Sequence, residues 1–568
     1  MRCGNLIGIA RAMVFGGWAF GGMAFGGVAF FGLAFLGLAF GLALFDQSTF
    51  AAAAESVNAP QDEDAQDKVD VYGDPLPKGA IARLGKVGAE AGEEEAPPYH
   101  THTVQDVQFS ADGKMAATCG LDLDVRIWDP ATGEQLHHFA NATHPFGFSP
   151  DGKYFLYTAI AGFSTQELRV WDFETKQDVG KTSEPVDTFA FRKSDGLLLR
   201  AFNGRLTTCR LPSLENAGLQ RPSFARILAI SPDGEYIVSA ASETVGEIRV
   251  YRSGQSSSMV RAIPLGARER ARRLRVAVSP DNRMLAVAGD THVIFVWELA
   301  TGTQLHRFIG HRRDIHDIEF SPDGKFLVTA GLGASARIWN LSTWKEVESH
   351  IEQAEEIKAI AFAPDGSRLA TASSDRTALV WELAPDLAET AQPQPLTAER
   401  FDKLWQDLAS NEPNLGFHAA SELFADMPTA VPLIQERIDE ILQPSQSAKI
   451  QDLIADLDSD EFMVREQATE ELIRFRDVAI DELNHALQET RSPEVKHRIK
   501  RILSTPEDKP RFSPLETARM VRVIDLLARD GGEESIALLQ TLAKGFPSRE
   551  IMRAAQLALA EFGDSGGE

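Results

Sequence analysis

The chain has 568 residues, enough for several hydrophobic cores, and carries a formal net charge of -25. So acidic a chain is a poor candidate for a general nucleic-acid binder, which needs a basic surface to displace counterions from phosphates. Its three cysteines, Cys3, Cys119 and Cys209, are too few for a disulfide framework, and no CxxC pair is present to hold zinc.

At the amino terminus, residues 1–45 form a hydrophobic segment that is typical of protein export. Its only charged side chains are Arg2 and Arg11, and no other charge follows until Asp46. The run exceeds both the usual signal core of about 7 to 15 residues and the roughly 20 residues that span a bilayer, so we expect a retained anchor. The amino end would then stay in the cytoplasm, and the rest of the chain would be extracytoplasmic.

Two alternatives remain open for this segment. The small residues before Glu55 offer a cleavage site near Ala54, which would give an exported soluble protein. The five-residue repetition of Ala-Phe pairs instead allows a mis-assigned start codon and a soluble cytoplasmic protein. Residues 46–75, which are acidic, rich in alanine and without periodicity, are predicted to be a disordered linker.

Residues 76–390 contain a tag of the form apolar-Ser-Pro-Asp-Gly, which recurs seven times at a period near 42 residues. Within a copy, a segment such as IHDIEF alternates apolar and polar residues, and Pro-Asp-Gly then supplies a tight turn. Four short strands in about 40 residues make one blade of a β-propeller. The aspartates of the seven tags are Asp112, Asp151, Asp195, Asp233, Asp281, Asp323 and Asp365.

The two ends of this region complement each other. After VWEL, at 380–383, the chain has no outer strand, whereas DPLPKGAIARLG, at 74–85, has a strand without a blade. We expect the amino-terminal strand to complete the last blade, because an open sheet edge would otherwise promote aggregation.

These repeats resemble the WD40 family across about residues 76–385. Trp128-Asp129 and Trp171-Asp172 keep the family's dipeptide, and the later copies vary it. The resemblance implies a buried hydrogen-bonded tetrad of His, Thr, Asp and Trp, in which Gly333 replaces the sixth blade's aspartate and the seventh blade lacks the histidine. The implied tetrad residues are His100, Thr118, Asp122 and Trp128 in blade one, His311, Thr329 and Trp339 in blade six, and Thr371, Asp375 and Trp381 in blade seven.

Residues 395–565 change to a helical period. VREQATEELIRFRD places Val464, Ala468, Leu472 and Phe475 on one face, and similar patterns lie 49 residues upstream and 87 residues downstream. Three helix pairs of one design predict a short α-solenoid that resembles HEAT repeats. The fold is therefore predicted to be mainly β, a seven-bladed WD40 β-propeller followed by an all-α HEAT-like domain, and the whole chain resembles bacterial WD40 proteins with a helical extension.

Residues 310–324 hold the densest group of acids and histidines, which invites a metal or acid/base interpretation. Strand alternation sends neighbouring side chains to opposite faces, so a structural role is the better interpretation. His311 would then be a tetrad donor, Asp323 a turn residue, and Asp317 and Glu319 would flank the apolar strand positions.

Two further patterns imitate ligand sites. Residues 455–466 resemble a calcium loop, but Glu461 stands where the sharp turn requires glycine, so we expect a helix-pair turn with Ser459 or Asp460 capping the next helix. The phosphate-loop pattern GFSPDGKY has Tyr154 in place of the metal-binding hydroxyl and is interpreted as a blade turn. No cofactor and no metal are expected.

The largest charge anomaly is the basic segment RAIPLGARERARRLR at 261–275. An exposed blade connection accounts for it as well as a functional site does. As a site it would suit carboxylate or phosphate partners, or it would dock the acidic helical domain. The candidate partner-binding residues are Arg268, Arg270, Arg272, Arg273 and Arg275.

From these features we expect a non-enzymatic scaffold that binds other proteins and is exported or tethered to a membrane. One alternative is a regulatory or sensor subunit of a signalling assembly, because the resemblance extends to bacterial proteins fused to protein kinases. The other is an exported propeller enzyme, a lyase or hydrolase acting in the central channel.

Overall fold

The computed structural model describes residues 68–88, 97–161, 166–220, 226–240, 246–253, 259–265, 274–289, 292–347, 351–383, 395–442, 445–504, 512–546 and 548–563. The predicted signal or anchor at 1–45, the site near Ala54 and the predicted linker up to residue 67 lie outside these ranges. Within them, no helix combines the length and the apolar character needed to cross a membrane.

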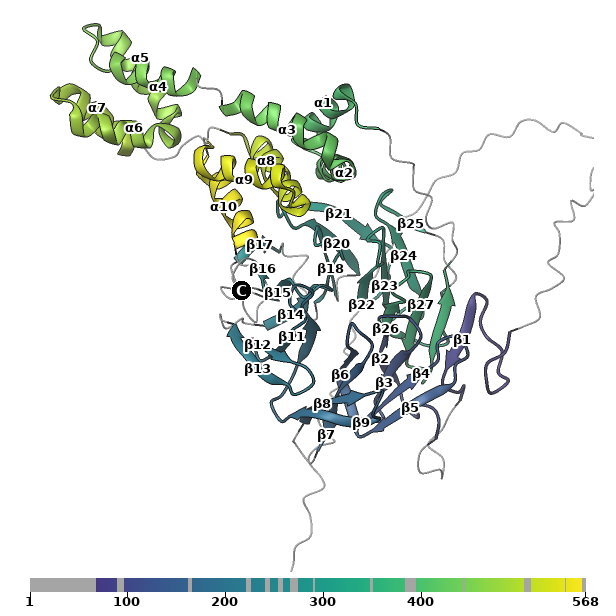
Figure 1. The fold of residues 1–568 in the computed structure, drawn as a ribbon. Coiled ribbons are helices and arrows are strands. Elements are labelled where there is room, and N and C mark those ends of the chain that lie inside the picture. Colours follow the sequence, from purple (N-terminus) through teal and green to yellow (C-terminus); the bar gives the residue numbers. More distant parts are fainter. Residues whose placement is uncertain are drawn as a thin grey trace, which may run out of the picture. The chain divides into compact units, whose positions relative to one another are not determined.

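Seven antiparallel sheets of four strands each form a ring, which confirms the predicted seven-bladed β-propeller (Figure 1). The first strands of neighbouring blades pack against each other, as β14 does with β18 and β22 with β26, so these strands line the centre of the ring. The strands of blades one to three are β2 (Val104–Phe109), β3 (Ala116–Gly120), β4 (Asp124–Trp128), β5 (Gln135–Ala140), β6 (Ala142–Phe148), β7 (Tyr154–Ile160), β8 (Gln166–Asp172), β9 (Gln177–Thr182), β10 (Thr188–Phe191), β11 (Leu198–Phe202), β12 (Arg205–Arg210) and β13 (Glu215–Gln220).

Blades four to seven continue this order, four strands to a blade. Blade seven takes three strands from the end of the propeller and its fourth from the beginning. The strands are β14 (Arg226–Ile230), β15 (Tyr236–Ala240), β16 (Glu247–Arg252), β17 (Met259–Pro264), β18 (Arg275–Val278), β19 (Met284–Ala288), β20 (Val293–Glu298), β21 (Gln304–Ile309), β22 (Ile315–Phe320), β23 (Phe326–Gly331), β24 (Ala336–Asn340), β25 (Lys345–Val347), β26 (Ile357–Phe362), β27 (Arg368–Ser373) and β28 (Ala378–Glu382), with β1 (Ala80–Leu84).

The ring closes through β1, as the sequence predicts. β1 lies antiparallel to β28, with Ala80 opposite Trp381 and Leu84 opposite Ala378. The residues just before β1 are ordered too, because Asp70 is buried in an ion pair with Arg83. The described structure therefore begins ahead of the strand that completes the ring.

The turn between β22 and β23 shows how the repeated tag shapes a blade. Ser321 Oγ donates to Asp323 Oδ1 at 2.6 Å and accepts the Phe326 N–H at 2.9 Å. Gly324 has φ of 69°, in the left-handed region that glycine adopts without strain. Because every blade has this order of antiparallel strands, the tag turns share one face of the ring, called the turn face below. The same Ser-to-Asp bond closes the turns at Asp112, Asp151, Asp233 and Asp281.

The described residues after the propeller form ten helices that build two cores. The first three helices share one core with the last three, and the middle four form the other. The helices are α1 (Ala398–Asp407), α2 (Pro413–Phe424), α3 (Met427–Leu442), α4 (Ser445–Asp456), α5 (Phe462–Arg474), α6 (Arg476–Glu489), α7 (Pro493–Ser504), α8 (Pro514–Asp530), α9 (Glu533–Gly545) and α10 (Arg549–Gly563).

Helix termini follow the capping rules at α8 but not at α5. At α8, Ser513 and Glu516 form a reciprocal capping box, and Gly531 ends the helix in the left-handed conformation. At α5 the N-cap is Glu461, whose side chain makes no capping bond, so the predicted cap by Ser459 or Asp460 is wrong. Arg465 instead donates to the Ser459 and Asp460 carbonyls, which fixes this turn from within the helix.

Candidate functional site

In blade one the four implied tetrad residues lie within hydrogen-bonding distance of one another. His100 Nδ1 is 3.0 Å from Asp122 Oδ1, and His100 Nε2 is 2.8 Å from Thr118 Oγ1. Trp128 Nε1 donates to the same Thr118 hydroxyl at 2.7 Å. Burial raises the pKa of Asp122, but the hydrogen bond and charge of His100, together with the Thr101 N–H and Arg126, outweigh burial and hold that pKa below its usual value.

Blade six has the same chain without the carboxylate. His311 Nε2 lies 2.7 Å from Thr329 Oγ1, which accepts Trp339 Nε1–H at 2.9 Å. Gly333 occupies the aspartate position, and no described residue takes over as acceptor for His311 Nδ1. Burial, assisted by the nearby Arg337, lowers the pKa of His311 to about 4. This histidine therefore stays neutral at physiological pH.

The remaining blades keep fewer of these groups. In blade seven Trp381 Nε1 donates to Thr371 Oγ1 at 2.9 Å, and Asp375 accepts from Thr377. The indole N–H groups of Trp171 in blade two and Trp297 in blade five are buried and have no described acceptor. The Thr-to-Trp bond is thus present in blades one, six and seven.

The acidic side chains Asp317 and Glu319, within residues 310–324, link two blades of the ring. Asp317 and Glu319 are two residues apart on β22, after a β-bulge between Ile315 and Asp317, so they lie on the same side of the strand. Asp317 Oδ2 accepts the Ile360 N–H at 2.9 Å, and Glu319 Oε2 accepts the Phe362 N–H at 3.0 Å. Burial raises the pKa of Asp317 to about 7 and that of Glu319 well above its usual value. These carboxyls bind the free backbone edge of β26 in blade seven.

The basic segment is described only at its two ends, residues 261–265 and 274–275. Arg268, Arg270, Arg272 and Arg273 lie outside the described residues. Arg275 begins β18, where its side chain donates to the His316 carbonyl of blade six. In the described part of the chain, Arg275 therefore links two blades, and the other four arginines stay a prediction.

The helical region docks on blade five through a buried ion pair. Arg522 of α8 donates to Glu298 at the end of β20, with Nε–Oε1 at 2.9 Å and Nη2–Oε2 at 2.8 Å, and both side chains are only 3% exposed. Arg522 Nη1 also reaches the Leu408 carbonyl at 2.6 Å. A Cβ at Gly416 would lie 2.2 Å from Arg522 Nη1, so this glycine permits the close approach of α2.

A second set of contacts joins α2 to the turn face. Arg283, just after the blade-five tag, donates to Ser421 Oγ at 2.7 Å and to the Phe417 carbonyl at 3.2 Å, and its guanidinium lies 4.3 Å from the Phe417 ring centre. Trp344 of blade six reaches His418 at 3.2 Å. Sequence reasoning missed these residues. The signal was present as Arg522, a lone charge on the apolar face of α8.

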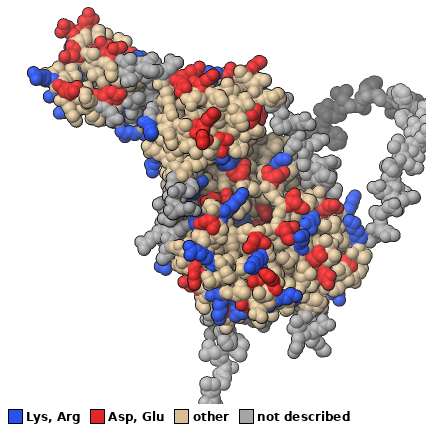
Figure 2. Space-filling view, in the orientation of Figure 1, with Lys and Arg blue, Asp and Glu red and all other residues tan. Residues whose placement is uncertain are grey.

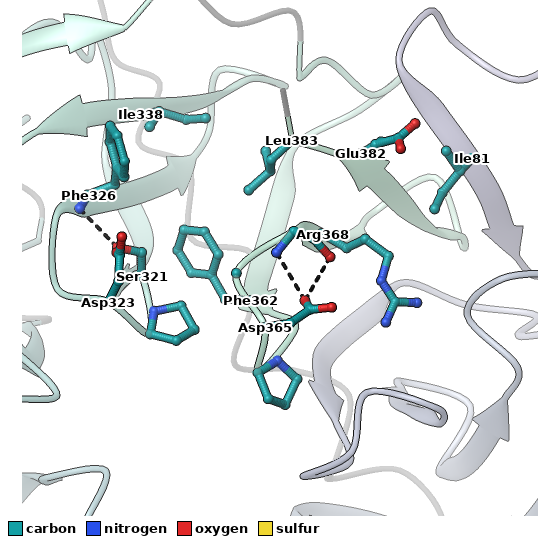
Figure 3. Close-up of a pocket in the computed structure, with 14 residues that line it drawn as sticks. Ile81, Ser321, Asp323, Phe326, Ile338, Phe362, Asp365, Arg368, Glu382 and Leu383 are labelled. Atoms are coloured by element: carbon teal, nitrogen blue, oxygen red, sulfur yellow. Dashed lines mark hydrogen bonds between the residues drawn. The ribbon is translucent and has the colours of Figure 1, made fainter. Parts of the chain in front are cut away.

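A cavity of about 650 Å³ opens on the turn face between blades six and seven (Figure 3). Blade six contributes Phe326 and Ile338, and blade seven contributes Phe362 and Leu383. Figure 3 shows Phe362 between the two turns that carry Asp323 and Asp365. The walls are thus apolar, and the rim carries carboxylates.

Charges elsewhere do not gather into one patch on the face that Figure 2 shows, where acidic and basic side chains are interspersed over the propeller. In the described residues no group of three or more His, Cys, Asp or Glu is arranged to hold a metal ion, and the aspartates of the calcium-loop pattern form none. The pocket and the helix dock are therefore the most distinctive surfaces of the described chain.

Comparison with known sequences agrees with this geometry. The model of the WD domain, G-beta repeat, matches residues 97–129, 302–340 and 343–382, the segments that carry the Thr-to-Trp bonds. Meiotic recombination protein rec14 of Schizosaccharomyces pombe is 26% identical over 225 residues, which are 37% of this chain and 57% of that protein. Serine-threonine kinase receptor-associated protein of Gallus gallus is 22% identical over 229 residues, 39% of this chain and 62% of that protein.

A third relative, small ribosomal subunit protein RACK1 of Brassica napus, is 33% identical over 112 residues, 19% of this chain and 32% of that protein. The chain thus spans less than two thirds of the length of each of these relatives. The matches and the ring of blades together show that the chain is a seven-bladed β-propeller with WD40 repeats in blades one, six and seven, followed by a helical domain.

Proposed function

We propose that this protein is a non-enzymatic scaffold that holds partner proteins together. The observation that carries the proposal is the buried, bidentate Arg522–Glu298 pair, which locks a helical region onto a closed ring of blades. Locking two repeat modules into one body fixes the separation and orientation of their exposed surfaces, which is what a scaffold requires.

The hydrogen bonds of the candidate catalytic groups support the same role. His311 and the aspartates of the tags are hydrogen-bonded within blades, and Asp317 and Glu319 bind the backbone of the next blade. A catalytic acid or base must instead reach a substrate atom.

The names of the relatives point to assemblies. One is described as associated with a serine-threonine kinase receptor and another as a small ribosomal subunit protein. Both names place these relatives in larger assemblies, and the similarity covers 39% and 19% of this chain. The alternative of a regulatory subunit in a signalling assembly is a special case of this role, in which the partner is itself a kinase.

The hydrophobic residues 1–45 support a location on the far side of a membrane, with this segment as the tether. Amino-terminal sequencing of protein from fractionated cells tests this part alone. An intact amino end in the membrane fraction is expected. A start at Glu55 in a soluble exported fraction would replace the tether with a cleaved signal, and an intact soluble cytoplasmic protein would contradict export.

Partner binding is tested by mild crosslinking of native cells followed by affinity capture of the full chain. We expect at least one protein in stoichiometric amount, retained by wild type and reduced in Gly416→Ala, whose Cβ would clash with the Arg522 guanidinium and disturb the dock. Capture of the chain alone, together with a hydrolase or lyase activity in a substrate screen, would favour the enzyme alternative and reject the scaffold.

A further inference from the structure

The grooves on either side of blade six are built from equivalent residues. The tags at Asp281, Asp323 and Asp365 are 42 residues apart, and the strand registers agree, since Leu285, Leu327 and Leu369 face Trp297, Trp339 and Trp381. Any residue of blade five therefore has its counterpart in blade six 42 positions later.

The groove between blades five and six is filled. Phe417 of α2 is buried in one cluster with thirteen propeller side chains, among them Met284, Val296, Phe320 and Leu341. Moving these four forward by 42 positions gives Phe326, Ile338, Phe362 and Leu383, and all four line the cavity between blades six and seven. The open cavity is thus the next copy of a groove that this chain already uses to hold an aromatic side chain.

The rim of the open groove carries negative charge. Asp365 and Glu382 line its rim, and neither makes an ion pair with a described residue. The one cation in the lining, Arg368, is engaged, because it donates to the Gly113 carbonyl at 2.9 Å and lies 5.6 Å from the Phe109 ring. Hydrogen bonds from Ser367 hold the pKa of Asp365 below its usual value, so this carboxylate is ionised.

We propose that the groove between blades six and seven binds a helix of a partner protein, which inserts one aromatic or large aliphatic side chain between the turns and sets a lysine or arginine against Asp365 and Glu382. The proposal rests on the scaffold function and names the surface that carries it. The proposed helix would lie as α2 does. Helix α2 places Phe417 in the neighbouring groove, and Arg283 holds the helix there by donating to the Phe417 carbonyl and to Ser421 Oγ. Lys325 is the counterpart of Arg283, and its ammonium lies 3.6 Å from Asp323 Oδ2.

The first test uses a peptide with the sequence of residues 413–425, in which Glu422 is replaced by lysine, and the full chain. Fluorescence anisotropy is expected to show saturable binding that Phe417→Ala in the peptide abolishes. Asp365→Lys in the protein should weaken binding by about fivefold or more, because it turns a rim attraction into a repulsion. Equal binding of the Phe and Ala peptides, or no binding, would overturn the proposal.

Asp151→Lys is the matched control in blade two. Asp151 accepts the Lys153 N–H at 3.0 Å, as Asp365 accepts the Ser367 N–H at 3.0 Å, so both variants lose the same kind of turn bond. Peptide binding should survive Asp151→Lys unchanged. An equal loss in both variants would show that the effect comes from turn stability and would reject the groove.

The second test identifies the occupant in cells. A photo-crosslinking residue replaces Ser367 at the groove, or Lys153 at the equivalent blade-two position, and crosslinked segments are sequenced by mass spectrometry. The expected result is a helix of another protein with a basic residue within one turn of the crosslinked apolar one, seen only from position 367. A crosslink to residues 384–394 of the same chain, or to a second copy, would overturn the proposal.

The two proposals fail separately. If Asp365→Lys captures the same partners as wild type, the groove is rejected and the scaffold stands. If the peptide binds the groove but crosslinking and capture find no partner protein, the scaffold is rejected.

Discussion

Blades one and six contain the same His–Thr–Trp hydrogen-bond chain, but only blade one ends it on a carboxylate. In blade one Asp122 accepts from both His100 and the Thr101 N–H, which ties the loop before the inner strand to the loop after β3. In blade six Gly333 leaves the chain to end at His311. The difference separates two tasks of the tetrad: the Thr-to-Trp bond orders the strands, and the carboxylate fixes the loops.

Bonds to neighbouring blades do not distinguish the two blades. Blade six binds its neighbours through Arg275, which donates to its His316 carbonyl, and through Asp317 and Glu319, which hold blade seven. Inter-blade bonds of this kind stabilise the inner strand from the ring side. Blade one has such a bond too, since Asp106, the counterpart of Asp317, lies 2.7 Å from His144 Nδ1 of blade two.

The largest effect on the difference between the two blades is expected from Asp122→Ala. It leaves two donors without an acceptor, His100 Nδ1–H and Thr101 N–H, and should lower the local stability of blade one by about 3 kcal/mol. Native-state hydrogen exchange in β3 and β4 measures this loss. The control is Asp112→Ala in an exposed turn, for which about 1 kcal/mol is expected. Equal losses would show that the blade-one carboxylate does no more than an ordinary turn aspartate.

Acid should weaken blade six through His311. Its pKa is about 4 in the folded chain and about 6.5 when unfolded, so between these values the unfolded state binds the proton and the folded state does not. Stability from this group is therefore complete above pH 6.5 and lost as the pH falls toward 4, by at most about 3 kcal/mol. Hydrogen exchange of β23 and β24 between pH 7 and pH 4.5 follows the loss.

Asp317 and Glu319 titrate in the opposite sense in the same blade, because their raised pKa values make the folded state bind protons first. The difference between wild type and His311→Gln removes this background. A pH dependence that is the same in both proteins would contradict the role assigned to His311.

Gly333→Asp should make blade six resemble blade one. A Cβ at this position would meet only Ser335 Oγ, at 3.7 Å, so the side chain fits. A carboxylate beside His311 would raise its pKa and remove most of the acid loss, and would add about 1 kcal/mol at pH 7. Gly333→Asn is the control, since it offers a hydrogen bond without the charge and should leave most of the acid loss in place.

Much of the propeller could be predicted because its signals are local. The tag encodes a turn through Ser321, Asp323 and Gly324, and period-2 alternation encodes the strands around it. Ring closure by β1 followed from a simple count of strands. The positions of all four tetrad residues could be predicted in the same way, because His, Thr, Asp and Trp stand at fixed distances along the chain.

The contacts between modules could not be predicted in this way. Apolar faces on the helices were visible, but not that Leu404 and Ile551 share one core while Ala468 and Leu472 belong to another. The dock depends on Arg522 meeting Glu298, 224 residues away, and neither carries a local signature of its partner. Such pairs follow from the packing of whole surfaces, which periodicity does not encode.

The smallest stability change is expected in blade seven. Gln353 stands 18 residues before Thr371, the spacing that separates His100 from Thr118 and His311 from Thr329, and its buried amide has no hydrogen-bond partner among the described residues. Gln353→His should restore a donor to Asp375 and a partner to the Thr371 hydroxyl, and should raise the stability of blade seven by about 1 kcal/mol.

The stability gained in Gln353→His must come from the new tetrad bond, and not merely from the loss of a buried amide. Gln353→Leu removes the amide without adding a bond, so its effect should be the same in wild type and in Thr371→Val. The effect of Gln353→His should shrink in Thr371→Val, because the hydroxyl that it needs is gone. A double-mutant cycle on thermal unfolding compares the two, and an equal gain from His and Leu in both backgrounds would mean that blade seven has no vacant tetrad position.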